Sequence, residues 1–254
     1  MTALAKTSDA LGETRTIRHG FFGRQGGISS GEFDSLNVSV STGDTADNVE
    51  QNRSIVAQSL GGAPLVTLKQ VHSTRVVTVE AGALSDRAIE ADALVTRRGD
   101  ILIGVLTADC APLLLVDPHA GIIGAAHAGW AGAVNGILEN TVTAMEALGG
   151  QRRNMLLAIG PTISGKNYEV GEEFKAKALA ANPAAADAFF TPPGGKAHFD
   201  LPAFLVADAQ RIGLPAADNL ALCTYAQPDA FFSHRYATHQ GTRTGRQISV
   251  IGMA

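Results

Sequence analysis

The chain has 254 residues, of which 45% are hydrophobic and 17% are charged. This balance is typical of a globular protein and excludes an extended disordered chain, and the length suits one large domain. The formal net charge of -4 provides no basic excess that would track phosphates, so we expect no nucleic-acid partner.

Two cysteines do not make a disulfide framework for a chain of this size, which favours a reducing compartment. The first residues lack the apolar core of a signal peptide, and no run approaches the roughly 18 apolar residues of a membrane span. We therefore expect a cytoplasmic protein that has no membrane partner.

The first half of the chain predicts a leader, a helix and a series of strands. Residues 1–14 are polar and are expected to be a disordered or poorly ordered leader, whereas 15–254 are expected to form a single domain. A strand begins at Ile17 and gives way to a glycine-rich loop. Apolar residues at helical spacing, followed by two glycines, predict a helix over 47–60. Short apolar runs then predict strands over 65–72, 75–80, 91–96, 101–106, 112–117 and 121–127.

The second half mixes helices and strands. An apolar stripe predicts one helix over 131–148, and further helices are predicted over 170–181 and from Asp200, which is expected to cap its helix. Residues 180–188 are the best candidate for a mobile insert, and 220–252 are predicted to form a strand, a loop and a strand. Because strands and helices mix without strict alternation, the fold class is expected to be α+β, with mixed sheets covered by helices.

The stretch from Thr107 to Trp130 places a thiol and an imidazole at matching ends of a predicted hairpin. Two apolar runs flank a turn around Pro118 to Ala120, and this turn decides which residues face each other across the strands. To within one residue of register, Cys110 and His127 are predicted to be cross-strand neighbours, with β-carbons about 4.5 to 5.5 Å apart. At that spacing the two side chains can hold one ion.

A thiolate together with an imidazole is a ligand pair typical of zinc. His72, which lies between two predicted strands, is the best candidate for a third ligand. Three protein ligands would leave a fourth position for water or substrate, as in catalytic zinc sites. Two other interpretations stay open. Cys110 could attack a substrate with His127 as the base, or Cys110 could pack as a small hydrophobe while the histidines only form hydrogen bonds.

A series of motifs runs through nearly the whole chain from Ile17 onward. In order, they are HGFFGRQGGIS with SLN, KQVH, ADALVT, GVLTADCAPLLLVD, GAAHAGWAG, IGPTISGKNYEVG, CTY, FFSHR and TGRQISVI. Together they resemble the YfiH family, also called the multicopper polyphenol oxidase or laccase-domain family. TADC and HAGW at this separation, with QVH upstream, are the specific part of the resemblance.

The resemblance implies a single-domain α/β/β/α sandwich, with a zinc ion (Zn2+) held by His72, Cys110 and His127. It also implies purine nucleoside phosphorylase activity toward adenosine, inosine and methylthioadenosine, and adenosine deaminase activity in the same site. Copper oxidase chemistry fits the sequence poorly, because four coppers need more ligands than the 7 His and 4 Met of this chain provide.

Two further family positions are candidate catalytic residues. Arg24 lies in a loop rich in glycine amides, where a guanidinium could hold phosphate or a ribose hydroxyl. Asp109, beside Cys110, could orient a ligand histidine or act as a general acid or base. Both also have plainer interpretations, as an ordinary loop arginine and as a turn carboxylate.

Other positions are candidate substrate-binding residues. Asn37 in SLN could hydrogen-bond a purine or ribose, or it could cap backbone groups. Tyr168, Glu169 and Arg235 are candidates for lining the pocket, although Glu169 could instead stabilise the start of the following helix.

The chain departs from the family after FFSHR. The family usually shows a second arginine there, whereas this chain has Tyr236 followed by the insert ATHQGTR. Arg243 or Arg246 is a candidate to supply that arginine. His19, His119 and His234 are expected to be surface or structural residues.

These features leave three functions open. The first is a zinc-dependent purine nucleoside phosphorylase and adenosine deaminase that acts on a purine nucleoside and phosphate. The second is a cysteine- or zinc-dependent amide hydrolase, such as a peptidoglycan editing factor. The third is a non-catalytic binding module that keeps the metal for structure. The sequence predicts neither the preferred nucleoside nor the oligomeric state.

Overall fold

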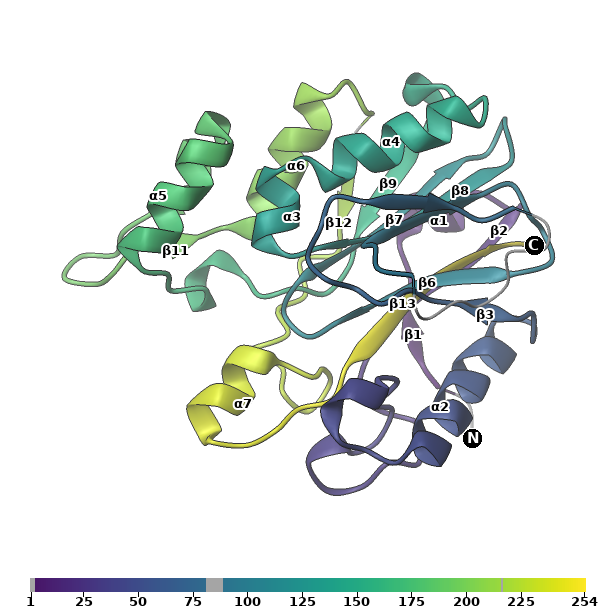
Figure 1. Cartoon of the computed structure of the whole chain (residues 1–254), viewed down its shortest axis with the longest axis horizontal. Coiled ribbons are helices and arrows are strands. Elements are labelled where there is room, and N and C mark those ends of the chain that lie inside the picture. The colour runs from purple at the N-terminus through teal and green to yellow at the C-terminus, as the bar shows by residue number, and fades with distance from the viewer. Residues whose placement is uncertain (1–2, 81–88, 216) are drawn as a thin grey trace.

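Two β-sheets form the centre of the computed structural model, which describes residues 3–80, 89–215 and 217–254 (Figure 1). The strands are β1 (Ala5–Lys6), β2 (Ile17–Phe22), β3 (Leu65–Val66), β4 (Val76–Thr78), β5 (Ala93–Thr96), β6 (Leu102–Thr107), β7 (Ala111–Asp117), β8 (Ile122–Ala128), β9 (Leu156–Ile159), β10 (Phe189–Phe190), β11 (His198–Phe199), β12 (Ala217–Asn219) and β13 (Gln247–Met253). The first sheet has the order β1-β2-β13-β6-β3, and the second has the order β12-β9-β7-β8-β5-β4. Both sheets mix parallel and antiparallel pairs, because β6 pairs with β3 in parallel and with β13 antiparallel, and β5 does the same with β4 and β8.

Helices cover the outer faces of the two sheets. The helices are α1 (Asp9–Gly12), α2 (Ala46–Ser59), α3 (Trp130–Val134), α4 (Ile137–Ala147), α5 (Glu172–Ala181), α6 (Leu201–Arg211) and α7 (His234–Gln240), with 3-10 segments η1 (Gly31–Phe33), η2 (Val40–Thr42), η3 (Arg152–Asn154), η4 (Gly165–Asn167) and η5 (Pro183–Ala188). Helices α3, α4 and α6 pack on the second sheet, and α2 packs on the first (Figure 1). The predicted α+β class, as an α/β/β/α sandwich with mixed sheets, is confirmed. Within the described part of the chain, no helix combines the length and apolar character of a membrane span.

The period of the strands explains these layers. All seven residues of β7 are buried, because the second sheet is covered on both faces. Successive side chains of a strand point to opposite faces. Leu113 and Leu115 accordingly join the apolar cluster under the helices, whereas Leu114 and Val116 join the cluster between the two sheets.

The residues before β2 are ordered, so the prediction of a disordered or poorly ordered leader is wrong for residues 3–14. They form β1 and α1, and Leu11 is fully buried. Ser8 caps α1, and its hydroxyl donates to Asp218 Oδ2 at 2.6 Å while its backbone N–H donates to His19. One apolar anchor and several polar contacts therefore hold this polar segment on the domain.

Three other predictions need correction. The helix predicted over 131–148 is split into α3 and α4, because Gly136 takes a φ of 92° between them. Residues 180–188, predicted as a mobile insert, form the end of α5 and η5, where Ala185 and Ala188 are buried. The first four residues of the ATHQGTR insert form the end of α7, a helix that was not predicted and whose C-cap, Gly241, takes the left-handed conformation.

Candidate metal centre and its cavity

The predicted ligands His72, Cys110 and His127 come from three separate segments and meet in space. Their ligand atoms all lie within 4.8 Å of one another. The distance from His72 Nε2 to Cys110 Sγ is 3.8 Å, and the two imidazole centroids are 4.7 Å apart. Donors around a tetrahedral zinc lie about 3.3 to 3.8 Å apart. A contraction of about 1 Å would therefore let the three residues hold one ion.

The hairpin brings Cys110 and His127 together in a different register from the predicted one. β7 and β8 pair Pro112 with His127, and continuing this register places Cys110 opposite Gly129. The prediction that Cys110 and His127 face each other to within one residue is therefore wrong. The reason is the turn. It was predicted around Pro118 to Ala120, but the connection between the strands covers 118–121 and so includes one more residue at its C-terminal end. The two ligands are diagonal neighbours on one face, so they still meet.

Gly129 leaves the space that the ligands occupy. A β-carbon at this position would lie 2.7 Å from His72 Cδ2 and 3.2 Å from Cys110 Sγ. The φ of Gly129 is -68°, which any residue adopts, so space and not backbone conformation requires glycine here. The glycine of the HAGW motif thus lets the loop with His72 approach the hairpin.

Asp92 is one residue of the candidate site that was not predicted from the sequence. It is fully buried at the start of β5, and its Oδ1 accepts hydrogen bonds from His127 Nδ1 at 2.8 Å and from the His72 backbone N–H at 3.0 Å. Its Oδ2 accepts from the Ser73 backbone and hydroxyl at 2.6 and 2.7 Å. The bond to His127 Nδ1 makes Nε2 the nitrogen that binds a metal once the ring has lost a proton, and the other bonds hold His72 at its φ of 60°. The signal in the sequence was a carboxylate inside the apolar motif ADALVT.

Burial and charge set the protonation of this group. Burial alone would raise the pKa of the Cys110 thiol, but the charge of His127 and hydrogen bonds from His127 and His72 outweigh it and lower the pKa to about 6. Burial would likewise lower the pKa of His127, but the Cys110 thiolate and Asp92 raise it to about 9. The pKa of Asp92 is lowered to about 2, because hydrogen bonds from His127 and Ser73 outweigh its burial. At neutral pH the group therefore contains a thiolate and an imidazolium.

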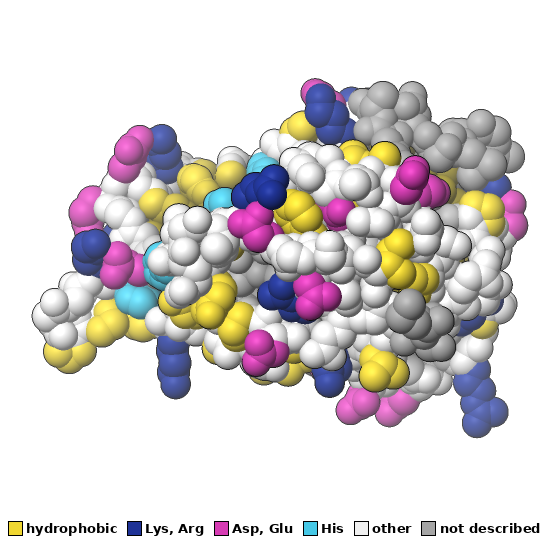
Figure 2. Space-filling view, turned by 90° about the horizontal axis from the view of Figure 1, so that it is seen from below, with side chains coloured by type: hydrophobic (Ala, Val, Ile, Leu, Met, Phe, Trp, Pro, Cys, Tyr) yellow, Lys and Arg dark blue, Asp and Glu magenta, His cyan; other side chains and the backbone are white. Residues whose placement is uncertain are grey.

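A cavity of about 660 Å³ opens beside the three ligands, a volume typical of small-molecule sites. Besides His72, Cys110 and His127, its lining consists of Ser39, Val40, Ser41, Arg53, Thr67, Leu68, Lys69, Gln70, Leu106, Thr107, Ala108, His234 and Arg246. Three lining residues are basic, and none of the described lining residues is Asp or Glu. On the face shown in Figure 2, by contrast, basic and acidic side chains are interspersed. The cavity is therefore a local concentration of positive charge.

The two residues predicted to be catalytic do not line this cavity in the described structure. Arg24 donates to the backbone carbonyls of Asp34 and Pro228 at 2.7 and 2.8 Å. The carboxylate of Asp109 accepts from the Thr224 hydroxyl and from the Arg235 backbone N–H, both at 2.6 Å. Asp109 therefore does not contact a ligand histidine, and Asp92 takes the orienting position that the sequence analysis offered to Asp109.

The predicted substrate-binding residues fall into two places. Arg235 lies over the ring of Tyr168 at 5.4 Å and donates to the backbone carbonyl of Glu169 at 3.0 Å, so these three form one cluster with Asp109. The Glu169 carboxylate is bonded to Lys196. Burial raises the pKa of Tyr168, with the charge of the nearby Cys110 adding to it. None of the three is among the described lining residues of the cavity.

Asn37 is fully buried and lies behind the cavity wall. Its amide nitrogen donates to Ser39, Thr42 and Asp44, and its oxygen accepts from the backbone N–H groups of Ser39 and Arg246. These contacts match the backbone-capping interpretation of Asn37.

Of the two arginines considered for the missing family position, Arg246 lines the cavity, whereas Arg243 is paired with Glu32 at 2.7 Å. His234, expected to be structural or at the surface, also lines the cavity. Arg53 comes from α2 and was not singled out in the sequence. Its position in the cavity depends on how α2 packs, which no local pattern showed.

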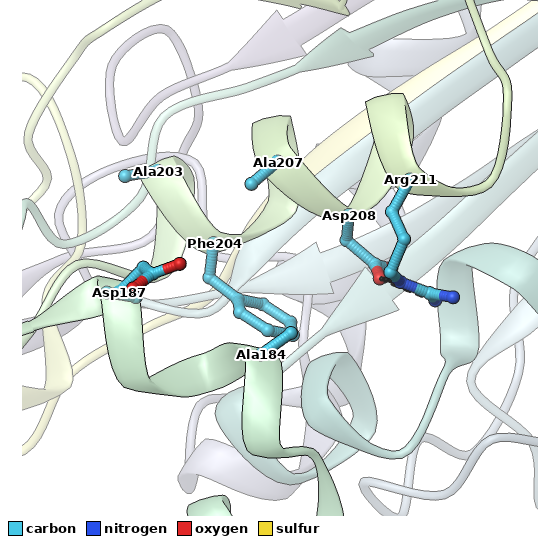
Figure 3. Close-up of a pocket in the computed structure, with 8 residues that line it drawn as sticks. Ala184, Asp187, Ala203, Phe204, Ala207, Asp208 and Arg211 are labelled. Carbon is cyan, nitrogen blue, oxygen red and sulfur yellow. Dashed lines mark hydrogen bonds and ion pairs between the residues drawn. The ribbon is translucent and has the colours of Figure 1, made fainter.

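A second hollow, of about 280 Å³, lies between η5 and α6 (Figure 3). Phe204 points from α6 toward Ala184, and Arg211 lies beside Asp208. The described lining residues of this hollow include neither His nor Cys, so it lacks the ligands of the metal centre.

Residues 18–254 match a protein family described as multi-copper polyphenol oxidoreductase laccase. A protein of Streptomyces coelicolor named purine nucleoside phosphorylase is 36% identical over 247 residues, which cover 95% of this chain and 98% of that protein. A Deinococcus radiodurans protein with the same name is 38% identical over 242 residues, covering 93% of this chain and 89% of that protein.

Solved structures share the whole fold. A Neisseria meningitidis protein aligns with a TM-score of 0.87 at 34% identity, covering 100% of this chain and 99% of that one. The protein YfiH of Bacillus licheniformis aligns with a TM-score of 0.86 at 29% identity, covering 94% of this chain and 93% of that one.

Proposed function

The chain belongs to the multi-copper polyphenol oxidoreductase laccase family, as its resemblance to the YfiH family predicted, and on this basis we propose that it is a zinc-dependent purine nucleoside phosphorylase that also deaminates adenosine. The observation that carries the proposal is the convergence of His72, Cys110 and His127 beside a cavity large enough for a nucleoside. The relatives named purine nucleoside phosphorylase supply the reaction class.

The donor set fits zinc. One thiolate and two imidazoles are ligands that zinc takes in proteins. Asp92 holds Nδ1 of His127, so Nε2 is the nitrogen that would bind zinc once the ring has lost a proton. Zinc bound there would act as a Lewis acid toward substrate or water in its remaining position. The family's description mentions several coppers, but within residues 3–80, 89–215 and 217–254 one such group of His, Cys, Asp or Glu converges. This supports a single metal site.

The charge of the cavity suits phosphorolysis. A phosphate oxygen attacks C1′ of the ribose, the bond from C1′ to the purine nitrogen breaks, and the base leaves with its electron pair and takes up a proton. Negative charge therefore enters with phosphate and moves onto the purine. The lining includes Arg53 and Arg246, and their guanidinium groups would stabilise such charge. Apolar side chains of Val40, Leu68 and Leu106 provide surface for the base.

Product analysis tests the proposal. Zinc-loaded protein is incubated with inosine, adenosine or methylthioadenosine, with and without phosphate, and bases, sugar phosphates and deaminated nucleosides are separated by chromatography. We expect phosphate-dependent release of base, phosphate-independent conversion of adenosine to inosine, and loss of both activities after chelation. His127→Ala should abolish both, whereas His119→Ala, an exposed histidine in the same hairpin, should not. Intact nucleosides after incubation of the zinc-loaded protein would refute the function.

One observation favours a second candidate, a cysteine-dependent amide hydrolase. Cys110, His127 and Asp92 stand in the relation of nucleophile, base and orienting carboxylate, and the Cys110 pKa of about 6 makes its thiolate available. Under this candidate, hydrolysis of a cell-wall peptide amide would survive chelation and would be lost in Cys110→Ala. A binding module that keeps the metal for structure would show neither activity, and Cys110→Ala would only lower its thermal stability.

A further inference from the structure

We propose that Arg246 and Arg53 form the phosphate subsite of this cavity, in place of Arg24, and this rests on the phosphorylase function proposed above. Arg53 belongs to α2, and Arg246 directly precedes β13. The two are far apart in sequence, yet both line the cavity that contains the metal ligands.

The first argument is charge. Arg53, Lys69 and Arg246 line the cavity, and no described lining residue is a carboxylate. Lys69 is exposed and paired with Glu90 at 2.8 Å, so its charge is compensated outside the cavity. The sulfur of Cys110 lies 3.8 Å from His72 Nε2, within the metal centre. A half-buried guanidinium such as Arg246 is stabilised by an oxyanion, and phosphate matches the planar fork of arginine.

The second argument is geometry. The backbone of Val38 connects the two arginines, because its carbonyl accepts from Arg53 Nε at 2.7 Å and its N–H donates to the Arg246 carbonyl at 3.1 Å. Arg246 Nη1 donates to the carbonyls of Thr244 and Gly245. Its Nε and Nη2 have no hydrogen-bond partner among the described residues. These two nitrogens form the edge of the guanidinium that can bind two phosphate oxygens together.

The third argument is the set of hydroxyls on the same wall. Ser39 and Ser41 line the cavity from the segment that follows Val38, and Thr67 accepts from Arg53 Nη1 at 3.3 Å. Thr107 also lines the cavity, and its buried Oγ1 has no hydrogen-bond partner among the described residues. A buried hydroxyl without a partner is costly, and a ligand oxygen would satisfy it. The wall thus combines two guanidinium groups with donors for further phosphate oxygens.

Arg24 lacks these properties. Its guanidinium donates to two backbone carbonyls and lies over the ring of Phe232 at 4.7 Å. These contacts connect the glycine-rich loop to the segment around Pro228, which is a structural arrangement. These contacts match the interpretation of Arg24 as an ordinary loop arginine, and the phosphate role for which it was one candidate falls to Arg246 and Arg53.

The test measures phosphate binding apart from turnover. Inorganic phosphate is titrated into zinc-loaded protein by isothermal calorimetry in a buffer free of phosphate and sulfate, and KM for phosphate is measured in base release. Arg246→Gln should weaken phosphate binding about tenfold or more, since it removes charge-assisted hydrogen bonds. Arg246→Lys keeps the charge but not the fork of the guanidinium. Its phosphate affinity should therefore lie between those of the unmodified chain and Arg246→Gln. Arg53→Gln should also weaken binding, whereas Arg243→Gln, paired with Glu32 outside the cavity lining, should bind as the unmodified chain does.

The outcomes separate this proposal from the function. Base release that keeps its KM for phosphate in Arg246→Gln and Arg53→Gln would overturn the subsite and leave the phosphorylase intact. Saturable phosphate binding that Arg246→Gln removes, in a protein that releases no base, would support the subsite and refute the function. Zinc content and melting temperature show whether each variant is folded. If folded Arg246→Lys binds phosphate no better than Arg246→Gln, the planar fork of the guanidinium is required for binding, and the subsite is supported. Equal weakening in Arg243→Gln would also overturn the proposal.

Discussion

Replacement of Asp92 by Asn tests whether this buried carboxylate organises the metal centre. The Asp92 oxygens accept five hydrogen bonds, from His127 Nδ1, the Ser73 hydroxyl and the backbone N–H groups of Val71, His72 and Ser73. In Asp92→Asn, an NH2 group replaces one of the two oxygens. Whether it takes the position of Oδ1 or of Oδ2, this NH2 group faces at least two of these donors. If the amide takes the position of Oδ1, the imidazole of His127 can adapt only by moving its proton to Nε2, the nitrogen that should bind the metal.

The magnitude follows from this change of tautomer. Loss of a carboxylate behind a ligand histidine lowers metal affinity about 10- to 100-fold, which corresponds to about 1.4 to 2.7 kcal/mol. In addition, backbone N–H groups that face the new NH2 group lose their acceptor, which lowers the free energy of unfolding by about 1 to 3 kcal/mol. Competition with a chromophoric chelator measures the zinc Kd, and chemical unfolding of the metal-free protein measures stability.

Asp117→Asn is the matched control. Asp117 is also fully buried and accepts three backbone hydrogen bonds, but it lies at the other end of β7 from Cys110. It should lose stability to a similar extent and keep its zinc affinity. A zinc Kd of Asp92→Asn within about twofold of the unmodified chain would refute the orienting role. An equal loss in Asp117→Asn would show that general destabilisation explains the effect.

Three further predictions concern the metal centre and the cavity beside it. Gly129→Ala should weaken zinc binding about tenfold by chelator competition, because its β-carbon would meet His72 at 2.7 Å; Gly171→Ala, with nothing within 4 Å, should not. At pH 7.5, zinc binding should release about one proton, measured by calorimetry in buffers of different ionisation enthalpy. Cys110, with a pKa of about 6, is already a thiolate, whereas His127, with a pKa of about 9, must lose its proton. Release of two protons would contradict this assignment of protonation states. Asn37→Ser should raise KM for phosphate more than KM for nucleoside, because Asn37 holds Arg246 and Ser39; the reverse would return Asn37 to the nucleoside-binding role that the sequence suggested.

The layers and the ligands could be predicted because each depends on local pattern. Short apolar runs mark the buried strands, and His72, Cys110 and His127 have the side chains that bind zinc. The register of β7 and β8 was predicted incorrectly, because it depends on the turn. There the Asp117 carboxylate accepts from the backbone N–H groups of His119 and Ala120 and fixes a longer connection.

Asp92 and Arg53 could not be found in the same way, because their roles depend on contacts between distant segments. Asp92 reaches His127 only because β5 pairs with β8, where Ala93 lies opposite Ala126. Arg53 reaches the cavity only because α2 packs on the first sheet and Val38 accepts its Nε. A carboxylate inside ADALVT marks Asp92 as unusual, but the sequence around it does not show that its partner is His127, and no local pattern marks Arg53.

The TADC motif connects the two sheets beside the cavity. Thr107 ends β6 in the first sheet and Cys110 immediately precedes β7 in the second, so the motif crosses from one sheet to the other beside the cavity. Asp109 takes a φ of 89°, which is strained for a residue with a side chain, and its carboxylate is held by Thr224 and by the Arg235 backbone. Thr107, Cys110 and Arg246 all line the cavity, so the crossing brings a metal ligand into the same cavity as the proposed phosphate subsite. We infer that Asp109 acts by shaping this crossing, which brings Cys110 into the cavity that contains the proposed phosphate subsite.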